Sequence, residues 1–473
     1  MNNHPQNYWL YSIFTYLVLL CTHGYIYGGN DQMDFMPYAR HIQDSSLFAQ
    51  DFYVNCINSK YNERFLLGNL IALFPLGTWP ILFYCIHAVC SVSLIYGVFT
   101  WCSKFIHKGW LMWLIGIALF SITYHFNLGG NELYYNMVCG SLISKSVGIW
   151  ALIHAYNSKW LTSAILAVMA TYFHPIAGLQ VFLLSAILIN TQYVFKYVCF
   201  GLPLVAPYIF LLIKDLNSNL SPALFTEIMF LRNAHHFFPG HFGLRNYLLV
   251  LPLFVIGTYL WRSIDIKIFR LCIFILAGCL LYVNMMIFYP KLAIQTQWFK
   301  STIWLKLFSL VAITRFASEW LCNPRPKITL ICLASLFILY KSSQVLVLNA
   351  YPVFGQNPNI QYAKSIEKSS TPGDLYLVSP AFTEFKFYSG QSTYIDWKAI
   401  PHNGACLEEW YRRIKIAYGF NPGSIGKTEN INEQANNYLL HLSEIQKKQL
   451  KSEGVTKIAV LDPKTSGLIS IVL

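Results

Sequence analysis

Long apolar runs separated by short polar links recur through the first three quarters of the chain. The first runs from residue 8 to 27, which is about the length an α-helix needs to cross the hydrocarbon core of a bilayer. Of the 473 residues, 55% are hydrophobic and only 12% are charged, a composition outside the range of ordinary soluble domains. The sequence therefore predicts a membrane protein with many spans.

Proline positions divide the longest runs. Residues 65–104 are too many for one crossing and contain Pro75 and Pro80, so we expect an interfacial or re-entrant piece followed by a span. Residues 160–190 should split into two short helices at His174-Pro175, because proline disfavours helix in the residue before it. With these divisions we expect about eleven transmembrane helices, the others lying near residues 8–27, 110–126, 142–157, 195–214, 246–261, 268–289, 302–319 and 328–348.

The last part of the chain has the composition of a soluble domain. Short β-type runs at 375–378, 457–461 and 468–472 alternate with helical patterns at 407–418 and 431–452, which predicts a small α/β fold. We thus expect an all-α polytopic membrane domain at 1–348 and a small α/β extracytoplasmic domain at 349–473. No spacing of a known catalytic motif occurs in this tail, so its expected role is that of a lid or packing domain.

The formal net charge of +13 comes from Lys and Arg residues spread thinly between apolar runs. No dense basic patch with interleaved aromatic residues occurs, so nucleic acid is not an expected partner. Short cytoplasmic loops are enriched in Lys and Arg, and anionic lipid attracts the same residues. A cytoplasmic N-terminus places in the cytoplasm Lys104, Lys108, Lys159, Lys196, Arg262, Lys267, Arg270, Arg325 and Lys327.

The same orientation places the acidic loops and the tail outside. We expect a multi-pass protein of a bacterial inner membrane whose first span is an uncleaved anchor, because no basic n-region or small-residue cleavage site is present. The twelve cysteines fall mostly within apolar runs and show no zinc-like spacing. Cys56 and Cys406 both lie in segments expected outside and could pair, although we expect them to be unpaired.

The first external loop, residues 28–53, is the strongest candidate for a working site. It carries Asp31 and Asp34 directly after the first span in a chain with few acidic residues. A carboxylate beside an apolar pocket can have a raised pKa, which suits it to accept a proton from a hydroxyl nucleophile. Asp31 or Asp34 is therefore the candidate catalytic base, and in a short helix the two share a face. The alternative is that these aspartates cap a loop helix.

A second carboxylate, Glu132, follows a Gly-Gly-Asn turn that matches the Gly-Gly-Asn before Asp31. Glycines there let the backbone approach a substrate closely. Glu132 could orient the base or share a divalent cation with it, and the alternative is a solvated loop end. No cofactor or metal ligand set is predicted.

Cations and histidines on the same expected face are candidates for binding a lipid-linked phosphate or a sugar. Arginine donates in bidentate fashion and lysine acts as a point charge, while an ionisable residue at membrane depth is a functional candidate by default. Adjacent histidines cannot both face one ligand in a regular helix or strand, so HHxxxxH is not zinc spacing. The candidate substrate-binding residues are Arg40, Lys145, His174, Arg232, His235, His236, His241 and Lys300. The alternatives are that the loop cations have no role, that Lys145 only extends its ammonium to the membrane surface, and that the histidines are core residues whose hydrogen bonds are made within the protein.

On these placements the chain resembles the GT-C superfamily of integral-membrane glycosyltransferases. Asp31 and Asp34 stand where that superfamily places an essential acid after the first span, Glu132 stands where a second acid is expected, and a soluble exterior domain follows the spans. The motifs RNAHHFFPGHF and YIDWKAIPHNG resemble signatures of a bacterial branch. The sequence departs from the superfamily in that its two acids are three positions apart.

The resemblance implies transfer of a hexose or pentose, with inversion, from a polyprenyl-phosphate-linked donor to an extracytoplasmic glycan, lipid or protein acceptor. An O-antigen-type polysaccharide polymerase or ligase is the nearest alternative, but it would carry its chemistry on one large Arg-rich loop. A lipid or solute transporter is the main alternative of another class, and it would place polar groups near the bilayer midplane.

Overall fold

The computed structural model describes residues 8–59, 62–216, 220–321, 323–349, 357–371, 373–420, 431–461 and 467–473. These residues form two compact units. Unit 1 comprises Met1–Tyr25, Phe83–Tyr208 and Arg232–Ala350, and unit 2 comprises Ile26–Leu82, Ile209–Leu231 and Tyr351–Leu473. The tail predicted as a domain from residue 349 is therefore only part of unit 2, because two earlier segments of the chain belong with it.

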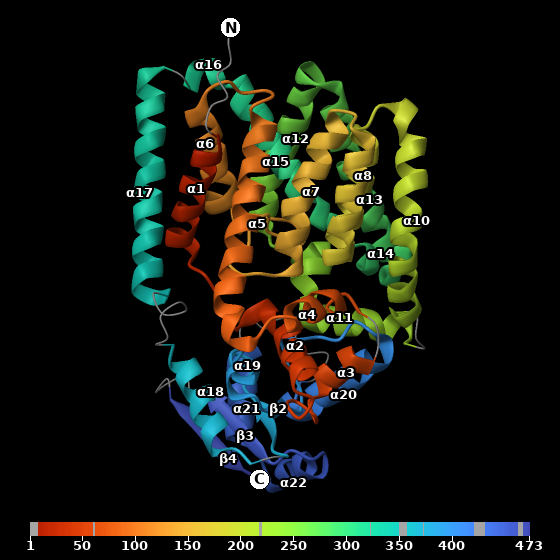
Figure 1. Cartoon of the computed structure of the whole chain (residues 1–473), viewed down its shortest axis with the longest axis vertical. Coiled ribbons are helices and arrows are strands. Elements are labelled where there is room, and N and C mark those ends of the chain that lie inside the picture. The colour runs from red at the N-terminus through yellow and green to blue at the C-terminus, as the bar shows by residue number, and fades with distance from the viewer. Residues whose placement is uncertain are drawn as a thin grey trace. The chain divides into compact units, whose positions relative to one another are not determined.

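Unit 1 is built from helices that run side by side (Figure 1). Three helices, α5, α10 and α11, also contain residues of unit 2. The helices are α1 (Tyr8–His23), α5 (Trp79–Cys102), α6 (Gly109–Ile117), α7 (Gly140–Tyr156), α8 (Trp160–Phe173), α9 (Pro175–Leu188), α10 (Thr191–Leu216), α11 (Pro222–Phe237), α12 (Leu244–Ile264), α13 (Ile266–Phe288), α14 (Pro290–Thr296), α15 (Thr302–Phe316), α16 (Ser318–Leu321) and α17 (Pro324–Asn349).

Five helices in the described part of the chain are long and apolar enough to cross a membrane: Leu76–Cys102, Thr191–Lys214, Leu244–Ile264, Ile266–Phe288 and Pro324–Val345. Shorter apolar helices occur at Gly109–Ile122, Trp160–Phe173 and Pro175–Leu188. These helices indicate a membrane protein, whereas the number of about eleven spans stays a prediction.

Both predicted proline breaks are present. Residues 65–104 divide into α4 (Phe65–Ala72), a 3₁₀ turn at Leu76–Thr78 and α5. Residues 160–190 divide into α8 and α9, with Pro175 in the first turn of α9. Proline is favoured there because backbone N–H groups in the first helical turn have no acceptor within the helix, so the N–H that proline lacks is not missed.

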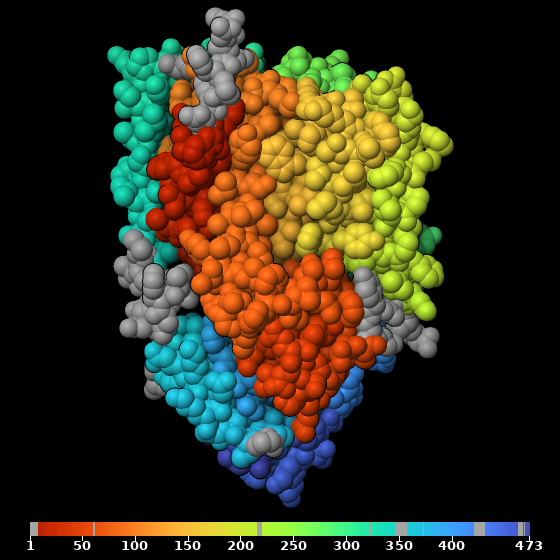
Figure 2. All heavy atoms as spheres, in the orientation of Figure 1, coloured from red at the N-terminus to blue at the C-terminus, as the bar shows by residue number. Residues whose placement is uncertain are grey.

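Small residues allow the helices of unit 1 to approach closely. A Cβ on Gly257 of α12 would lie 2.4 Å from the Cα of Ser309 in α15, so only glycine fits this crossing. Beside it, the Trp261 indole N–H donates to the Phe308 carbonyl at 2.9 Å. The outer face of α17, drawn in teal in Figure 2, instead exposes Leu336 and Leu339 at 63% and 67%, as expected for a helix that faces lipid.

Unit 2 contains a four-stranded sheet with strand order β2-β1-β3-β4, in which β1 is parallel to β2 and β3, and β3 is antiparallel to β4. Apolar side chains on both faces of β1 are buried, and on one face Tyr376 and Val378 pack with Ala363 and Ile366. The strands are β1 (Leu375–Val378), β2 (Ser392–Thr393), β3 (Lys457–Leu461) and β4 (Leu468–Val472). The helices around them are α18 (Pro358–Ser369), α19 (Phe385–Ser389), α20 (Gly404–Tyr418), α21 (Ile431–Leu440) and α22 (Glu444–Ser452).

The prediction of a small α/β fold in the tail is confirmed, with β1, β3 and β4 at the predicted residues. The helix predicted at 431–452 is two helices. Ser443 caps α22 through a capping box with Gln446, and such a cap begins a new helix.

The first external loop belongs to unit 2 because several contacts join it to the tail. With the residues that follow it up to Ser59, the loop folds into a 3₁₀ turn at Asn30–Asp34, α2 (Met36–Gln43) and α3 (Phe52–Ser59). Cys56 of α3 and Cys406 of α20 form a disulfide, with their Cα atoms 6.2 Å apart. The expectation that these two cysteines are unpaired is thus wrong, because packing of α3 against the tail brings together residues 350 positions apart.

Candidate functional site

The two candidate bases lie on the 3₁₀ turn Asn30–Asp34. Residues three apart eclipse one another in a 3₁₀ helix, so Asp31 and Asp34 share a face, as predicted for a short helix. Asp31 forms an ion pair with Lys398 at 2.7 Å, and Asp34 forms one with Arg64 at 2.8 Å. Both acids are therefore opposed by a cation within unit 2.

The environments of the two acids differ. Asp34 is 17% exposed, and burial of Arg64 is outweighed by the charge of Asp34, by its hydrogen bond with Arg64 and by the charge of Asp31, so the pKa of Arg64 is raised. The Tyr53 hydroxyl donates to the Asp34 carbonyl at 3.2 Å and helps to fix this part of the turn. Asp31 is 39% exposed. Asp31 is thus the more accessible of the two carboxylates, and Asp34 is the more firmly held.

Arg40, a predicted phosphate-binding residue, is buried in unit 2. Its guanidinium donates to the Phe387 carbonyl and lies 5.6 Å from the ring centroids of Phe48 and Phe387. These contacts join α2 to α19, so packing accounts for the position of Arg40.

Unit 1 places several of the other predicted residues around the loop that begins at Gly129. Lys145, only 1% exposed, donates to Asn131 Oδ1 at 2.6 Å and to the Glu132 carbonyl. Its ammonium lies 4.6 Å from the Tyr135 ring. The Asn131 amide donates to the Lys300 carbonyl at 2.8 Å. Glu132, Lys145 and Lys300 are therefore neighbours in unit 1.

His236 joins the same loop. Its Nδ1 is hydrogen-bonded to the Gly129 carbonyl at 3.2 Å, and a Cβ on Gly130 would lie 2.4 Å from that nitrogen. Gly130 also has a φ of +54°, so both the close approach and the backbone require glycine. Burial lowers the pKa of His236, and the nearby cation Lys300 lowers it further.

The remaining predicted residues have separate positions. His235 is exposed with its ring centroid 4.0 Å from that of His236, and Arg232 donates to Asn233 Oδ1 at 3.0 Å. His241 is exposed on the 3₁₀ turn Pro239–His241. His174 caps α9 by accepting a hydrogen bond from the Ala177 N–H at 3.2 Å, a structural task for its Nδ1.

Sequence reasoning missed one lysine of this region. Lys306 of α15 is 1% exposed and donates to Asn127 Oδ1 at 2.6 Å and to the Phe126 carbonyl at 3.2 Å. The signal was present, because Lys306 interrupts an apolar run in the same way as Lys145 does.

The two Gly-Gly-Asn turns have different backbones. Before Glu132, Gly129 and Gly130 both have positive φ, at +77° and +54°. Before Asp31, Gly28 has a φ of +70° while Gly29 is extended, and a 3₁₀ turn follows. The identical Gly-Gly-Asn sequences thus do not adopt the same backbone conformation.

A second polar cluster, absent from the sequence prediction, lies in unit 2. Asp51 is fully buried and accepts hydrogen bonds at 2.9 Å from the Val54 N–H, the Thr393 N–H and the Thr393 hydroxyl. Lys386, 2% exposed, pairs with Asp51 at 2.9 Å and also with Asp396. Burial opposes the charge of Lys386, but Asp396 and Asp51 outweigh it and raise its pKa.

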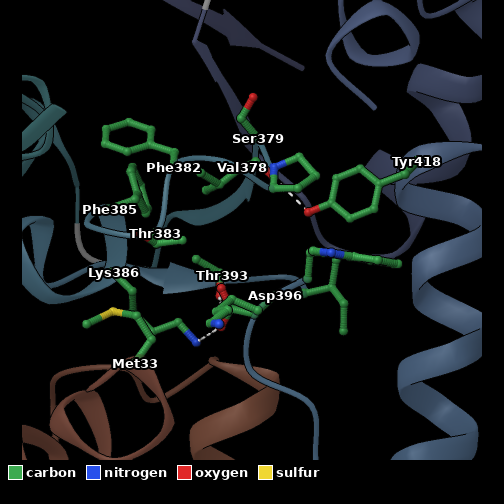
Figure 3. Close-up of a pocket in the computed structure, with 14 residues that line it drawn as sticks. Met33, Val378, Ser379, Phe382, Thr383, Phe385, Lys386, Thr393, Asp396 and Tyr418 are labelled. Carbon is green, nitrogen blue, oxygen red and sulfur yellow. Dashed lines mark hydrogen bonds and ion pairs between the residues drawn. The ribbon is translucent and has the colours of Figure 1, made fainter. Parts of the chain in front are cut away.

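Lys386 and Asp396 also line a pocket of unit 2 (Figure 3). Its other lining residues come from the turn that carries the candidate bases and from the tail: Met33, Val378, Ser379, Pro380, Phe382, Thr383, Phe385, Thr393, Ile395, Trp397, Lys398 and Tyr418. Burial raises the pKa of Asp396, and the charge of Asp51 adds to that effect against the pull of Lys386.

No group of three or more His, Cys, Asp or Glu side chains that could hold a metal ion occurs in the described part of the chain. The acids on the Asn30–Asp34 turn are paired with Lys398 and Arg64.

A family model described as a domain of unknown function, DUF6798, matches residues 360–417. This segment runs from within α18 to within α20 and includes every lining residue of the unit 2 pocket except Met33 and Tyr418. No curated protein matches the chain.

Proposed function

We propose that this protein is a membrane glycosyltransferase that transfers a sugar from a polyprenyl-phosphate-linked donor to an extracytoplasmic acceptor. The observation that carries the proposal is the position of Asp31. It lies on the turn Asn30–Asp34, a few residues after the apolar helix α1, partly exposed and ion-paired with Lys398. An ionised carboxylate in that position can accept the proton of an acceptor hydroxyl as the sugar is transferred.

The distribution of charge in unit 1 supports the proposed orientation, with about eleven spans and a cytoplasmic N-terminus. Lys104 donates to Asn157 at 3.0 Å, and both Lys104 and Lys267 lie over the Tyr156 ring, at 5.1 and 5.7 Å. Cations from separate loops thus meet at the end of α7, as expected at a cytoplasmic face. Lys145, beside Glu132, lies near the start of the same helix.

The disulfide supports an exterior position for unit 2. Disulfides persist in oxidising compartments such as the bacterial periplasm and are rare in the cytosol. Cys56 lies in the segment after α1 and Cys406 lies in the tail, so the disulfide favours a position of both segments on the oxidising side.

The cations around Glu132 supply a candidate site for the donor phosphate. Lys300 and Arg232 both act electrostatically on His236, which is bonded to the Gly129 loop. Two cations near one loop favour an anionic group by charge alone.

The test is transfer of radiolabelled sugar by membranes that contain the protein, supplied with a panel of undecaprenyl-phosphate-linked hexoses and pentoses. We expect Asp31→Asn to lower transfer by about 10²- to 10⁴-fold, the usual contribution of a general base. Asp44→Asn is the control, since Asp44 is an exposed acid of the same loop. Near-full transfer by both Asp31→Asn and Asp34→Asn would show that neither carboxylate is the base.

A further inference from the structure

The ion pair between Asp31 and Lys398 joins the turn that carries the candidate base to the tail. The Asp31 Oδ1 and Lys398 Nζ atoms are 2.7 Å apart, and the two side chains are 39% and 34% exposed. A pair with this much exposure is screened by water and contributes little to the stability of the fold. It still acts on the charge of Asp31, because an adjacent cation favours the ionised form of a carboxylate.

The backbone that carries Lys398 is held in place by buried groups. Lys398 stands two residues after Asp396, whose carboxylate pairs with the buried Lys386 (Figure 3). The Asp396 carbonyl also accepts a hydrogen bond from the indole N–H of the buried Trp410 at 2.8 Å. Both the side chain and the backbone of Asp396 are thus fixed, and they keep Lys398 within reach of the turn.

Several ionisable groups lie on the elements around this turn. They are Asp34, Glu63, Arg64, Glu384, Lys398 and His402. The carboxylates among them oppose the ionisation of Asp31, and the cations favour it. Arg64 acts on Asp31 through its charge but is hydrogen-bonded to Asp34 at 2.8 Å. Lys398 is in direct contact with Asp31, so its removal should change the charge balance at Asp31 strongly.

We propose that Lys398 is a positioning residue, which holds the Asp31 carboxylate ionised and in place to accept the proton of the acceptor hydroxyl. The ion pair stands on the geometry of unit 2, whereas its part in the reaction rests on the proposed function. As the acceptor oxygen bonds to the anomeric carbon, the bond from that carbon to the phosphate oxygen breaks and polyprenyl phosphate leaves. The hydroxyl proton passes to Asp31. Lys398 then favours release of this proton to water, which restores the ionised base.

The first test measures the protonation of Asp31 without any transfer reaction. A carbodiimide activates protonated carboxyl groups for coupling to glycinamide, and peptide mass spectrometry then gives the extent of coupling at Asp31 in the full-length protein in lipid nanodiscs. We expect Lys398→Met to raise the midpoint pH of this coupling by about one unit, a tenfold change in the ratio of protonated to ionised Asp31. Lys398→Arg should restore the natural midpoint. Coupling at Asp44, an exposed acid of the same loop, corrects for the pH dependence of the reagent.

The second test is the pH dependence of sugar transfer by the same variants. Transfer should fall as the pH falls through the protonation of Asp31, and Lys398→Met should move this fall to higher pH by about one unit. Lys457→Met is the matched control, because it removes a 2.7 Å ion pair of unit 2 whose acid is Asp374. It should leave both pH profiles unchanged. A loss of transfer by Lys398→Met that is equal at every pH would overturn the proposal, since it would show a structural role alone.

The two proposals fail in different ways. If Asp31→Asn abolishes transfer while Lys398→Met leaves the coupling midpoint of Asp31 unchanged, the positioning role is wrong and the proposed function stands. If the midpoint rises as expected while Asp31→Asn and Asp34→Asn transfer sugar normally, Lys398 does hold Asp31 ionised, and its part in the reaction falls together with the proposed base.

Discussion

The positive charge of buried lysines is compensated by different groups in the two units. In unit 2, Lys386 is held between the carboxylates of Asp51 and Asp396. In unit 1, Lys145 and Lys306 have only neutral oxygens as their hydrogen-bond acceptors among the described contacts, namely carbonyls, amide side chains and a tyrosine hydroxyl. Unit 2 compensates its buried lysine with carboxylates that pair with it directly, whereas unit 1 gives its lysines neutral hydrogen-bond acceptors and the Glu132 carboxylate acts on them only through its charge.

This difference decides what remains after a lysine is removed. A buried carboxylate without its cation is an uncompensated charge, whereas a carbonyl without its donor is an unsatisfied dipole. The same substitution should therefore have unequal effects in the two units.

The largest effect is expected for Lys386→Met. Asp51, fully buried, would keep its bonds from Val54 and Thr393 but lose its cation, and breaking a buried pair in this way costs about 3–5 kcal/mol. Hydrogen exchange of the β1 and β3 amides measures the free energy of local opening in unit 2. Lys364→Met, at an exposed position on α18, is the control. Equal exchange in the two variants would contradict the argument.

The next effect concerns the disulfide. A cross-link between distant residues restricts the unfolded chain, and its loss costs about 2–4 kcal/mol. A Cys56→Ser and Cys406→Ser double variant should therefore exchange faster in α3 and α20 than the natural chain. Reductant should speed exchange in the natural chain and leave the double variant unchanged. A response to reductant in the double variant would show that another cysteine is responsible.

A smaller effect is expected for Lys145→Met. It leaves the Glu132 carbonyl without this donor, whereas Asn131 Oδ1 still accepts from the Tyr135 hydroxyl at 3.2 Å, so we expect about 1–3 kcal/mol, the cost of one unsatisfied buried group. Exchange at 129–135 should rise, and less than β1 exchange rises in Lys386→Met. A larger loss than for Lys386→Met would mean that neutral oxygens are not the main partners of Lys145.

Much of the fold could be predicted from local sequence. Apolar runs and proline positions predicted the α8–α9 break, and β-type runs predicted β1, β3 and β4, because both signals act within a few residues. The start of α22 was readable too, since Ser443 and Gln446 form a capping box, but one continuous helix was predicted instead.

The candidate site was only partly predictable, for a physical reason. Lys145 stands out because it interrupts an apolar run, whereas Lys386 lies in polar sequence where a lysine is normally solvated. Its partner Asp51 is 335 positions away. Only packing of the first external loop against the tail shows that the two meet, and the same holds for Cys56 and Cys406.

The smallest effect is expected for an ion pair at the surface of unit 2. There Glu409 accepts hydrogen bonds from Arg412 and Arg413, each at 2.7 Å. The hydrogen bonds from Arg412, against the opposing effect of burial, lower the pKa of Glu409 to about 2. The ordinary value, near 4.5, describes the unfolded chain. Because the folded pKa is the lower one, the stabilisation is present above about pH 4.5 and is lost as the pH falls toward 2.

Glu409 and Arg412 are 34% and 45% exposed, so solvent screens the pair and we expect less than about 1 kcal/mol. Glu409→Gln should therefore raise exchange of the α20 amides slightly at pH 6, and the difference from the natural chain should shrink below about pH 4.5 and vanish only as the pH falls toward 2. Glu408→Gln, an exposed neighbour on the same helix, is the control. A difference that grows on acidification would contradict this account, because an acid with a lowered pKa stabilises the folded state only while it is ionised.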